Sequence, residues 1–568
     1  MWRCAVFLVC SLVVVACGED WRIVNIDQGP VRGYLHPDRT YYSFFNIPYA
    51  TAPTGTDRFK APLPAPVFLS TFDAVNRNII CPQPFGTLQM QEDCLVANVF
   101  VPNAEATNLP VLVVVHGGAY QLGHGLAENF QNFVREKHLI LVTFNYRLGV
   151  HGFLCLGTEG APGNAGLKDQ VALLRWVNRN IASFGGNPDD VTLAGCSAGS
   201  GSVDFLTISS LTQGLFKKAI LESGISTGAT GTQIDAIQNA KDYAKVLNFN
   251  DVDDLDKLEE FYRTASFQLL ASRVDQIINN PDVTTRFAPC VERDIGQERV
   301  IMDSPMNIKT GGNYTKVPLL YGFTNMEGAM RLPSFDDWKV RMNDKFSDFL
   351  PAELHFESEE VKEEVAQKVK QFYFGNDPVS EENIVSYILY FTDVLFSYPM
   401  LRSLSSRVEA LGDTIYLFEY SFVDEDTPSF PHTQVRGADH CHQFVAVMDH
   451  DVSHRTDEFK RMQHLLREYW ISFIKNGSPS SSNLSLPTWV PANSARSPHL
   501  SLGPVLQLKD DILEGRADFW DPIYDEYYRG PVIPSPEPES EPTTDGAVTQ
   551  MISNILYVAV ILTIYLAL

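Results

Sequence analysis

Residues 191–199 read Val191-Thr192-Leu193-Ala194-Gly195-Cys196-Ser197-Ala198-Gly199. The first four residues predict a strand, and the small residues after Ser197 fit the start of a helix. A sharp turn between strand and helix brings the backbone close to its neighbours, so side chains at 195 and 199 would clash. Ser197 is then exposed at the apex and can act as a nucleophile. The bare motif also occurs in ordinary turns, so its context decides.

A second glycine-containing loop lies upstream of this turn. Residues 111–115 are all valine or leucine and predict a buried strand, which stops at His116-Gly117-Gly118-Ala119. Backbone N–H groups of such a loop can stabilise a developing oxyanion. We therefore expect Gly117 and Gly118, with the amide of Ala198, to form an oxyanion hole. A plain β-turn is the alternative for the loop alone, but two such motifs in this order favour catalysis.

Strand-like and helical segments alternate around these two motifs. Apolar runs at residues 111–115, 139–144 and 191–194 are separated by helical patterns, and residues 165–184 carry apolar side chains at helical spacing before Gly185-Gly186. This alternation predicts an α/β fold with a doubly wound, mostly parallel sheet. Residues 358–373 and 457–474 are helical by the same test. We expect residues 235–420 to supply helices and loops that cover the site.

A serine nucleophile needs a histidine that removes its proton and a carboxylate that orients the histidine. On this type of fold they follow in the order serine, acid, histidine. Residues 318–322 predict a further strand, and the loop after it contains Glu327, our candidate acid. Composition alone does not distinguish Glu327 from the other acids. The candidate base is His440, in a loop that begins at Gly437. His442, two residues later, is the alternative.

The composition of the 568 residues is that of a globular protein, with 45% hydrophobic and 20% charged residues. The net charge of −25 disfavours nucleic acid as a partner. A zinc site is conceivable, with ligands Cys441, His442, His450 and His454. No His-Glu-x-x-His or paired-cysteine motif supports it. We therefore expect no metal and no organic cofactor.

Both ends of the chain differ from its centre. Arg3, an apolar stretch at residues 5–16 and a small-residue cleavage site predict a signal peptide at residues 1–18. Residues 530–547 are rich in proline, glutamate, serine and threonine and predict a linker, and residues 548–568 form a hydrophobic tail. The tail fits a glycolipid (GPI) attachment signal, with a short membrane span as the alternative. We expect an extracellular protein tethered to the outer cell surface.

Glycosylation sequons and cysteines fit this location. The sequons are at Asn313, Asn476 and Asn483, of which the second is weakened by Pro479. Cys81 and Cys94 are close enough in sequence to close a small surface loop. The other mature cysteines are expected to be free buried thiols: Cys155, Cys196, Cys290 and Cys441. A Cys196–Cys441 disulfide is the less favoured alternative, suggested because each flanks a proposed catalytic residue.

With these motifs in place, the chain resembles the type-B carboxylesterase and cholinesterase family of α/β hydrolases over about residues 24–520. Further ordered motifs that carry the resemblance are Asn46-Ile47-Pro48-Tyr49-Ala50, Glu92-Asp93-Cys94-Leu95, Asn145-Tyr146-Arg147-Leu148-Gly149 and Gly163-Asn164-Ala165-Gly166-Leu167-Lys168-Asp169-Gln170. The resemblance implies an α/β-hydrolase domain at residues 19–529, with Ser197 as nucleophile, Glu327 as acid and His440 as base. It also implies a Cys81–Cys94 disulfide and a structural ion pair between Arg147 and Asp169.

The resemblance further implies a serine carboxylesterase acting on small-molecule esters. Cys196 and Gln443 stand where the family often has acids, which weakens attraction for cationic substrates. Residues 65–80 also lack a tryptophan to hold a quaternary ammonium, since Phe68 and Phe72 are the only aromatics there. We therefore expect neutral esters rather than choline esters. The alternative is an adhesion protein of the same family, whose usual mark is a replaced triad residue.

Overall fold

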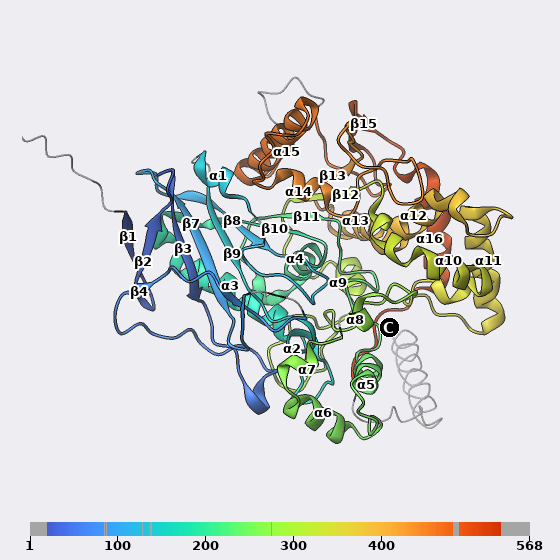
Figure 1. Cartoon of the computed structure of the whole chain (residues 1–568), viewed down its shortest axis with the longest axis horizontal. Coiled ribbons are helices and arrows are strands. Elements are labelled where there is room, and N and C mark those ends of the chain that lie inside the picture. The colour runs from blue at the N-terminus through green and yellow to red at the C-terminus, as the bar shows by residue number, and fades with distance from the viewer. Residues whose placement is uncertain are drawn as a thin grey trace, which may run out of the picture.

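The computed structural model describes residues 20–535, except 85, 87, 128, 137–138, 274 and 481–487. Within these residues a sheet of 13 strands runs through the molecule (Figure 1). In spatial order its main strands are β1 (Trp21–Ile26), β2 (Gly29–Leu35), β3 (Tyr41–Pro48), β7 (Val96–Pro102), β9 (Ile140–Phe144), β8 (Leu109–Val115), β10 (Gly186–Cys196), β11 (Lys218–Glu222), β12 (Leu319–Thr324), β13 (Ile415–Tyr420), β14 (His499–Leu502) and β15 (Leu506–Lys509). β4 (Phe72–Asp73) pairs with β2, and β5 (Ile79–Ile80) pairs with β6 (Gln89–Met90) in a separate ribbon.

The strands from β9 to β14 are parallel to one another. The flanking pairs β1–β2, β2–β3, β3–β7, β7–β9 and β14–β15 are antiparallel. The predicted doubly wound α/β fold is therefore confirmed. In such a sheet the carboxyl ends of the parallel strands meet along one edge, where ligands bind. Residues that follow β10, β12 and β13 are consequently brought together although they lie far apart in sequence.

Both faces of the sheet are buried, as the continuous apolar runs require. In β8 the side chains of Val111, Val113 and Val115 belong to one hydrophobic core, and those of Leu112 and Val114 belong to a second. This alternation follows from the two-residue period of a strand. Helix α3 packs in the first core and α15 in the second, so helices cover the sheet on both sides (Figure 1).

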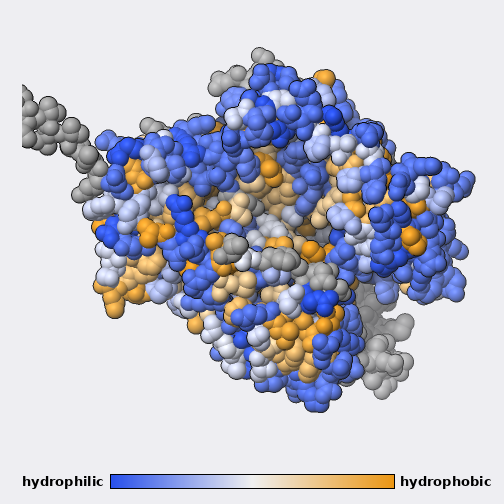
Figure 2. All heavy atoms as spheres, viewed as in Figure 1, coloured by the Kyte–Doolittle hydropathy of each residue, from blue (hydrophilic) through white to orange (hydrophobic). Residues whose placement is uncertain are grey.

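The helices differ in length and in their position around the sheet. They are α1 (Gln131–Arg135), α2 (Gly149–Phe153), α3 (Ala165–Asn180), α4 (Ala198–Ile208), α5 (Ala236–Val246), α6 (Leu255–Thr264), α7 (Phe267–Leu270), α8 (Asp275–Ile278), α9 (Pro305–Gly311), α10 (Phe335–Asp344), α11 (Glu359–Phe374), α12 (Ile384–Thr392), α13 (Tyr398–Leu411), α14 (His442–Val447), α15 (Asp457–Asn476) and α16 (Arg516–Tyr527). Helices α10, α11, α12 and α16 form a lobe beside the carboxyl edge of the sheet (Figure 1). In Figure 2 a recess with apolar side chains lies between this lobe and the sheet, within a mostly hydrophilic surface.

The three predicted long helices are confirmed with small shifts at their ends. The first is α3 followed by the short 3-10 helix η2 (Ile181–Phe184), and it ends at Gly185 in the left-handed region at φ 94°. Glycine suits this position because it has no Cβ to clash there. Residues 358–373 are matched by α11 and residues 457–474 by α15.

Helices α12 and α13 are joined by a π-helical turn, η7 (Asp393–Ser397). The continuous run Glu381–Leu411 is apolar and long enough to cross a membrane, but 83% of its most apolar window is buried inside the protein. It is therefore a core helix of the described chain. Single π-helical turns are frequent at functional sites, since they bulge the helix and redirect its side chains.

A buried ionic cluster anchors α4, the helix that follows Ser197. Asp204 in α4 accepts hydrogen bonds from Lys309 Nζ at 2.5 Å and from Arg407 at 2.8 Å. These partners come from α9 and α13, and all three side chains are almost fully buried. Two cations around one carboxylate satisfy charges that would be costly to bury alone. The cluster thus ties α4, the helix that follows Ser197, to α9 and α13.

Candidate active site

Ser197 lies at a sharp turn between β10 and α4. Its backbone has φ 58° and ψ −129°, a strained conformation for a residue with a side chain. A Cβ at Gly195 would lie 2.4 Å from the carbonyl carbon of Gly199, and a Cβ at Gly199 would lie 2.1 Å from Val115 O. The steric reason predicted for both glycines is therefore confirmed.

Glu327 and His440 are in direct contact. Glu327 opens the 3-10 helix η4 (Glu327–Ser334) just after β12, and its side chain is fully buried. Its Oε1 accepts a hydrogen bond from Thr324 N at 2.8 Å, and its Oε2 lies 2.6 Å from His440 Nδ1. A carboxylate held in this way fixes the imidazole tautomer with the proton on Nδ1 and leaves Nε2 as the basic nitrogen.

The two rival histidines have different partners. His442 begins α14, and its Nδ1 lies 3.6 Å from Asp439 Oδ1. Only His440 of the pair contacts Glu327, and its ring stacks on Phe396 at 4.3 Å between centroids. Phe396 lines the same cavity as Ser197. Acid, base and serine thus converge on one edge of the sheet.

The expectation of four free thiols is wrong. Cys196 is bonded to Cys441, and Cys155 is bonded to Cys290, over sequence separations of 245 and 135 residues. Pairing over such distances leaves no local signal, because it depends on which loops the topology brings together. Cys441 is therefore not available as a zinc ligand. Cys81 and Cys94 are also bonded, over 13 residues.

The Cys196–Cys441 disulfide joins the residue before the serine to the residue after the histidine. Cys441 Sγ lies 3.7 Å from His440 Nε2, the nitrogen that faces away from Glu327. The bond therefore restrains the loop that carries His440 against the turn that carries Ser197. A restraint at this point reduces the freedom of both groups before the substrate binds.

Removing this disulfide in a Cys196→Ser, Cys441→Ser variant should lower kcat by about 10-fold or more, because small misplacements of catalytic groups have large effects on rate. The matched control is Cys155→Ser with Cys290→Ser, which opens another long-range disulfide outside the catalytic cavity. Both variants should lose thermal stability by similar amounts. Ester hydrolysis per folded molecule should fall only in the first, and equal losses in both would contradict a positioning role.

The loop around Gly117 and Gly118 lies beside the serine turn. A Cβ at Gly117 would lie 2.8 Å from Cys196 O and 3.4 Å from Ser197 Cβ, so only glycine permits this approach. Gly118 has φ 110°, and a Cβ there would lie 2.2 Å from Leu122 O. Ala198 follows Ser197 and lines the cavity. Of the three residues expected to form the oxyanion hole, Gly117 and Ala198 therefore adjoin Ser197, and Gly118 follows Gly117 in the same loop.

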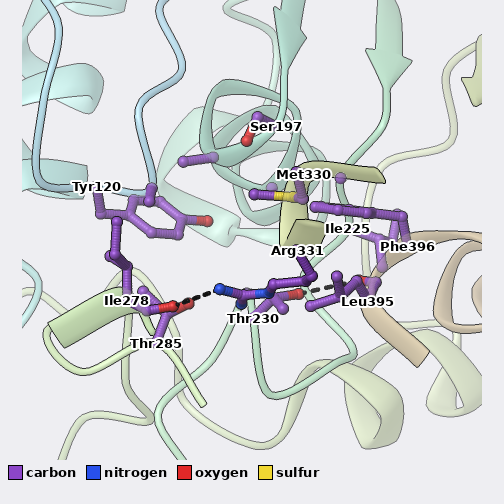
Figure 3. A pocket seen from close by; sticks show the side chains of 15 residues that line it. Tyr120, Ser197, Ile225, Thr230, Ile278, Thr285, Met330, Arg331, Leu395 and Phe396 are labelled. Carbon is purple, nitrogen blue, oxygen red and sulfur yellow. Dashed lines mark hydrogen bonds between the residues drawn. The ribbon is translucent and has the colours of Figure 1, made fainter. Parts of the chain in front are cut away.

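Ser197 opens into a small cavity (Figure 3). Its other lining residues are Ala119, Tyr120, Ala198, Gly201, Gly224, Ile225, Thr230, Gly231, Ile278, Thr285, Met330, Arg331, Leu395 and Phe396. Most of these were not predicted from the sequence. Tyr120 adjoins the glycine loop and Met330 and Arg331 follow Glu327, so proximity to the motifs could have suggested them. Leu395 and Phe396 come from the π-helical turn, which has no such signal.

A buried acid lies directly behind the serine turn. Glu222 ends β11, its backbone carbonyl accepts a hydrogen bond from Ser197 N at 2.9 Å, and its Oε1 accepts one from Trp470 Nε1 at 3.1 Å. Burial, with a smaller contribution from the charge of Glu327, raises the pKa of Glu222 to about 8. The carboxyl is therefore neutral at pH 7.

Replacing Glu222 with glutamine should stabilise the protein increasingly as pH rises. The folded chain keeps the proton of Glu222 up to about pH 8, whereas the unfolded chain releases it near the ordinary glutamate pKa, so stability is lost between these values. The variant should therefore gain about 1.4 kcal/mol in unfolding free energy per pH unit, relative to wild type, from roughly pH 5 to pH 8. Urea unfolding measures this slope. The exposed, arginine-paired Glu298→Gln should show no slope, and a flat difference for Glu222→Gln would contradict the prediction.

Two further predictions concern residues that do not line the cavity. Arg147 and Asp169 form a buried bidentate ion pair, with N–O distances of 2.8 and 2.7 Å, and are confirmed as a structural pair. Phe68 and Phe72 stack on each other at 4.7 Å, and neither lines the cavity. Gln443, where an acid is frequent in the family, donates a hydrogen bond from Nε2 to Ser223 Oγ at 2.8 Å. None of these residues places a negative charge in the cavity.

Known proteins resemble this chain over most of its length. The profile of the Carboxylesterase family matches residues 20–520. Juvenile hormone esterase of Heliothis virescens is 33% identical over 83% of this chain and 88% of its own length, and a carboxylic ester hydrolase of Bombus ignitus is 30% identical over 88% and 94%. Para-nitrobenzyl esterase of Bacillus subtilis (strain 168) is 32% identical over 82% and 92%.

Solved structures agree with the sequence matches. The juvenile hormone esterase of Manduca sexta, with OTFP covalently attached, aligns with a TM-score of 0.77 at 28% identity, over 89% of this chain and 100% of that one. A PNB esterase aligns with a TM-score of 0.71 at 29% identity, over 88% and 99%. The fold is thus that of the α/β hydrolases. The chain belongs to the carboxylesterase family and is a carboxylic ester hydrolase.

Proposed function

We propose that the protein hydrolyses carboxylic esters by two acyl transfers through Ser197. The observation that carries this proposal is the buried Glu327 Oε2 at 2.6 Å from His440 Nδ1, next to the strained Ser197 turn. The Cys196–Cys441 disulfide links the neighbours of Ser197 and His440, and Phe396, which stacks on His440, lines the cavity with Ser197. Such a pair makes Nε2 of the histidine a base for the serine hydroxyl. The covalently attached OTFP of the Manduca sexta relative supports a covalent intermediate.

In the first step Ser197 Oγ attacks the ester carbonyl carbon while His440 Nε2 takes the hydroxyl proton. The carbonyl oxygen becomes an oxyanion, which the N–H groups of Gly117, Gly118 and Ala198 stabilise. Collapse of this tetrahedral intermediate breaks the ester C–O bond, and His440 returns its proton to the departing alcohol. Glu327 stabilises the imidazolium throughout.

In the second step water attacks the acyl-enzyme, with His440 Nε2 as base again. The second oxyanion rests on the same N–H groups, and its collapse releases the carboxylic acid and restores the Ser197 hydroxyl. The groups in this sequence are side chains and backbone amides of the chain itself. Atoms and protons balance over the two steps, with one water consumed per ester.

We also propose that neutral esters are preferred over choline esters of equal acyl length. No carboxylate is among the residues that line the cavity in the described part of the chain, and Arg331 lies in its wall. A cation there opposes a quaternary ammonium group in the same space. p-Nitrophenyl esters of graded acyl length and matched choline esters test this preference. A strong preference for choline esters of equal acyl length would overturn it, and no hydrolysis of any ester by the folded protein would favour the adhesion alternative.

We further propose that the protein is exported and held at the outer cell surface. Three disulfides are typical of an extracellular protein. Asn313 and Asn476 are exposed, as glycosylation requires. Asn483, the signal peptide at residues 1–18, the tail at residues 548–568 and most of the linker at residues 530–547 lie outside the described residues. Release of full-length protein from intact cells by phosphatidylinositol-specific phospholipase C would support a lipid anchor, and retention would favour a membrane span.

A further inference from the structure

Arg331 is a buried cation in the wall of the catalytic cavity. It lies in η4, one helical turn after Glu327, and only 7% of its surface is exposed. Figure 3 shows its side chain crossing the cavity on the side opposite Ser197, between Ile278 and Leu395. Burial lowers the pKa of Arg331 to about 10, so the guanidinium still carries its charge at neutral pH.

The guanidinium has no carboxylate partner in the described part of the chain. One terminal nitrogen donates to Ile278 O at 3.0 Å and to Asn279 Oδ1 at 3.3 Å, and the group lies 5.6 Å from the ring centroid of Trp338. Its Nε is buried with no hydrogen-bond partner. The contacts with neutral oxygens and with an aromatic ring therefore leave at least one N–H donor of the guanidinium, that of Nε, without a hydrogen bond.

Two other buried arginines of this protein have carboxylate partners. Arg147 forms a bidentate pair with Asp169, and Arg407 pairs with Asp204 and Asp413. Burying a charge without a counter-ion is costly, and proteins normally avoid it. An exception in the wall of a catalytic cavity indicates that the counter-ion arrives with the substrate.

We propose that Arg331 binds a carboxylate carried by the ester substrate at a distance from the scissile bond. This inference rests on the proposed function, because the same serine chemistry acts on the ester group. A guanidinium binds a carboxylate through two parallel N–H···O bonds, which makes it more specific than a point charge. Met330, Leu395, Phe396 and Ile225 supply apolar walls nearby, suited to the methylene chain that joins the two groups. The preferred substrates are thus half-esters of dicarboxylic acids or esters of hydroxy acids.

The test compares substrates that differ only in charge. One arm uses monomethyl esters of linear dicarboxylic acids, from succinate to suberate, which place the carboxylate on the acyl side. The other uses acetyl esters of ω-hydroxy acids, which place it on the alcohol side. Each is paired with its primary amide, a neutral substrate of nearly equal shape. Near-physiological salt limits long-range repulsion by the chain's net charge of −25.

In wild type, at least one carboxylate substrate should exceed its amide in kcat/KM by about 10- to 100-fold, the usual range for a charge-assisted hydrogen-bonded pair. Arg331→Gln should abolish this ratio, and Arg331→Lys, which keeps the charge but not the fork, should retain part of it. Arg461→Gln removes an exposed arginine of α15 and should leave the ratio unchanged. The arm that shows the preference identifies the side of the ester that faces Arg331.

The ratio within each variant is independent of how much protein folds. Inhibition of amide-ester hydrolysis by free dicarboxylates gives a second readout, and it should weaken in Arg331→Gln by the same factor. If wild type hydrolyses the amides as fast as the carboxylates in both arms, the inference fails and the proposed function stands. If folded wild type hydrolyses neither class nor any simple ester, the proposed function itself fails.

Discussion

Ser197→Ala should lower kcat/KM for every ester substrate by about 10⁴-fold or more, because the variant has no group to form the acyl-enzyme. The serine hydroxyl is small and lies at the surface of the catalytic cavity, so its removal should not disturb the fold. The glycines at 195 and 199, which permit the turn, remain in place. Residual rate above water would come from the oxyanion hole and substrate binding alone.

The measurement is hydrolysis of a p-nitrophenyl ester by purified variant and wild type, with folding checked by thermal unfolding. Ser209→Ala is a suitable control. Ser209 lies at the end of α4, the helix that begins just after Ser197, and its side chain caps the short 3-10 helix that follows. That variant should lose about 1 kcal/mol of stability and keep its activity. Mass spectrometry after brief exposure to a phosphonate ester should show one adduct in wild type and none in Ser197→Ala. More than about 1% of wild-type activity in Ser197→Ala would contradict a role as nucleophile.

Glu327→Gln should lower kcat by about 10³- to 10⁴-fold without unfolding the protein. The amide is nearly the same size as the carboxylate, but it has no charge to stabilise the imidazolium. It can also turn its N–H₂ toward His440 Nδ1, which then accepts a hydrogen bond, so the proton moves to Nε2 and the base is lost. Because Glu327 Oε2 lies 2.6 Å from His440 Nδ1, the amide of the variant is close enough to donate this reversed hydrogen bond.

A second buried glutamate provides the control for Glu327→Gln. Glu353 is 1% exposed and accepts a hydrogen bond from Tyr524 at 2.9 Å, outside the catalytic cavity. Glu353→Gln should keep the wild-type kcat. Single-turnover kinetics should show that Glu327→Gln slows formation of the acyl-enzyme as well as its hydrolysis, since His440 serves both steps. A loss of less than about 10-fold in kcat would mean that Glu327 does not orient the base.

Features of this protein that depend on neighbouring residues could be predicted from its sequence. The turn at Ser197 could be predicted because its glycines are required by contacts within a few residues and by the adjacent strand β8. The parallel strands β8, β9, β10 and β12 were predictable from apolar runs, because a parallel sheet covered on both faces needs apolar side chains at every position. Helix α3 was predictable because its apolar period and the glycine at its end are properties of the segment itself.

The sequence named His440 as the candidate base but left His442 as a rival, and the structure shows that His440 is the one in contact with Glu327. Both histidines lie in one short segment, and only the position of Glu327 at the end of β12 distinguishes them. The sequence favoured free thiols over the Cys196–Cys441 disulfide for the same reason, because the two cysteines are 245 residues apart. Residues brought together in this way leave no pattern in a single sequence.

The sequence by itself determined the fold class, the nucleophile turn and the family resemblance, because backbone sterics and hydrophobic periodicity act over neighbouring residues. The tertiary structure brought Glu327, already predicted as the acid, into contact with His440, and it alone decided that all six cysteines of the described residues are paired and that Arg331 and Phe396 line the cavity. These contacts depend on the order of strands in the sheet and on the loops at its carboxyl edge. That order is set by the packing of the whole chain, since burial of both sheet faces is a collective property.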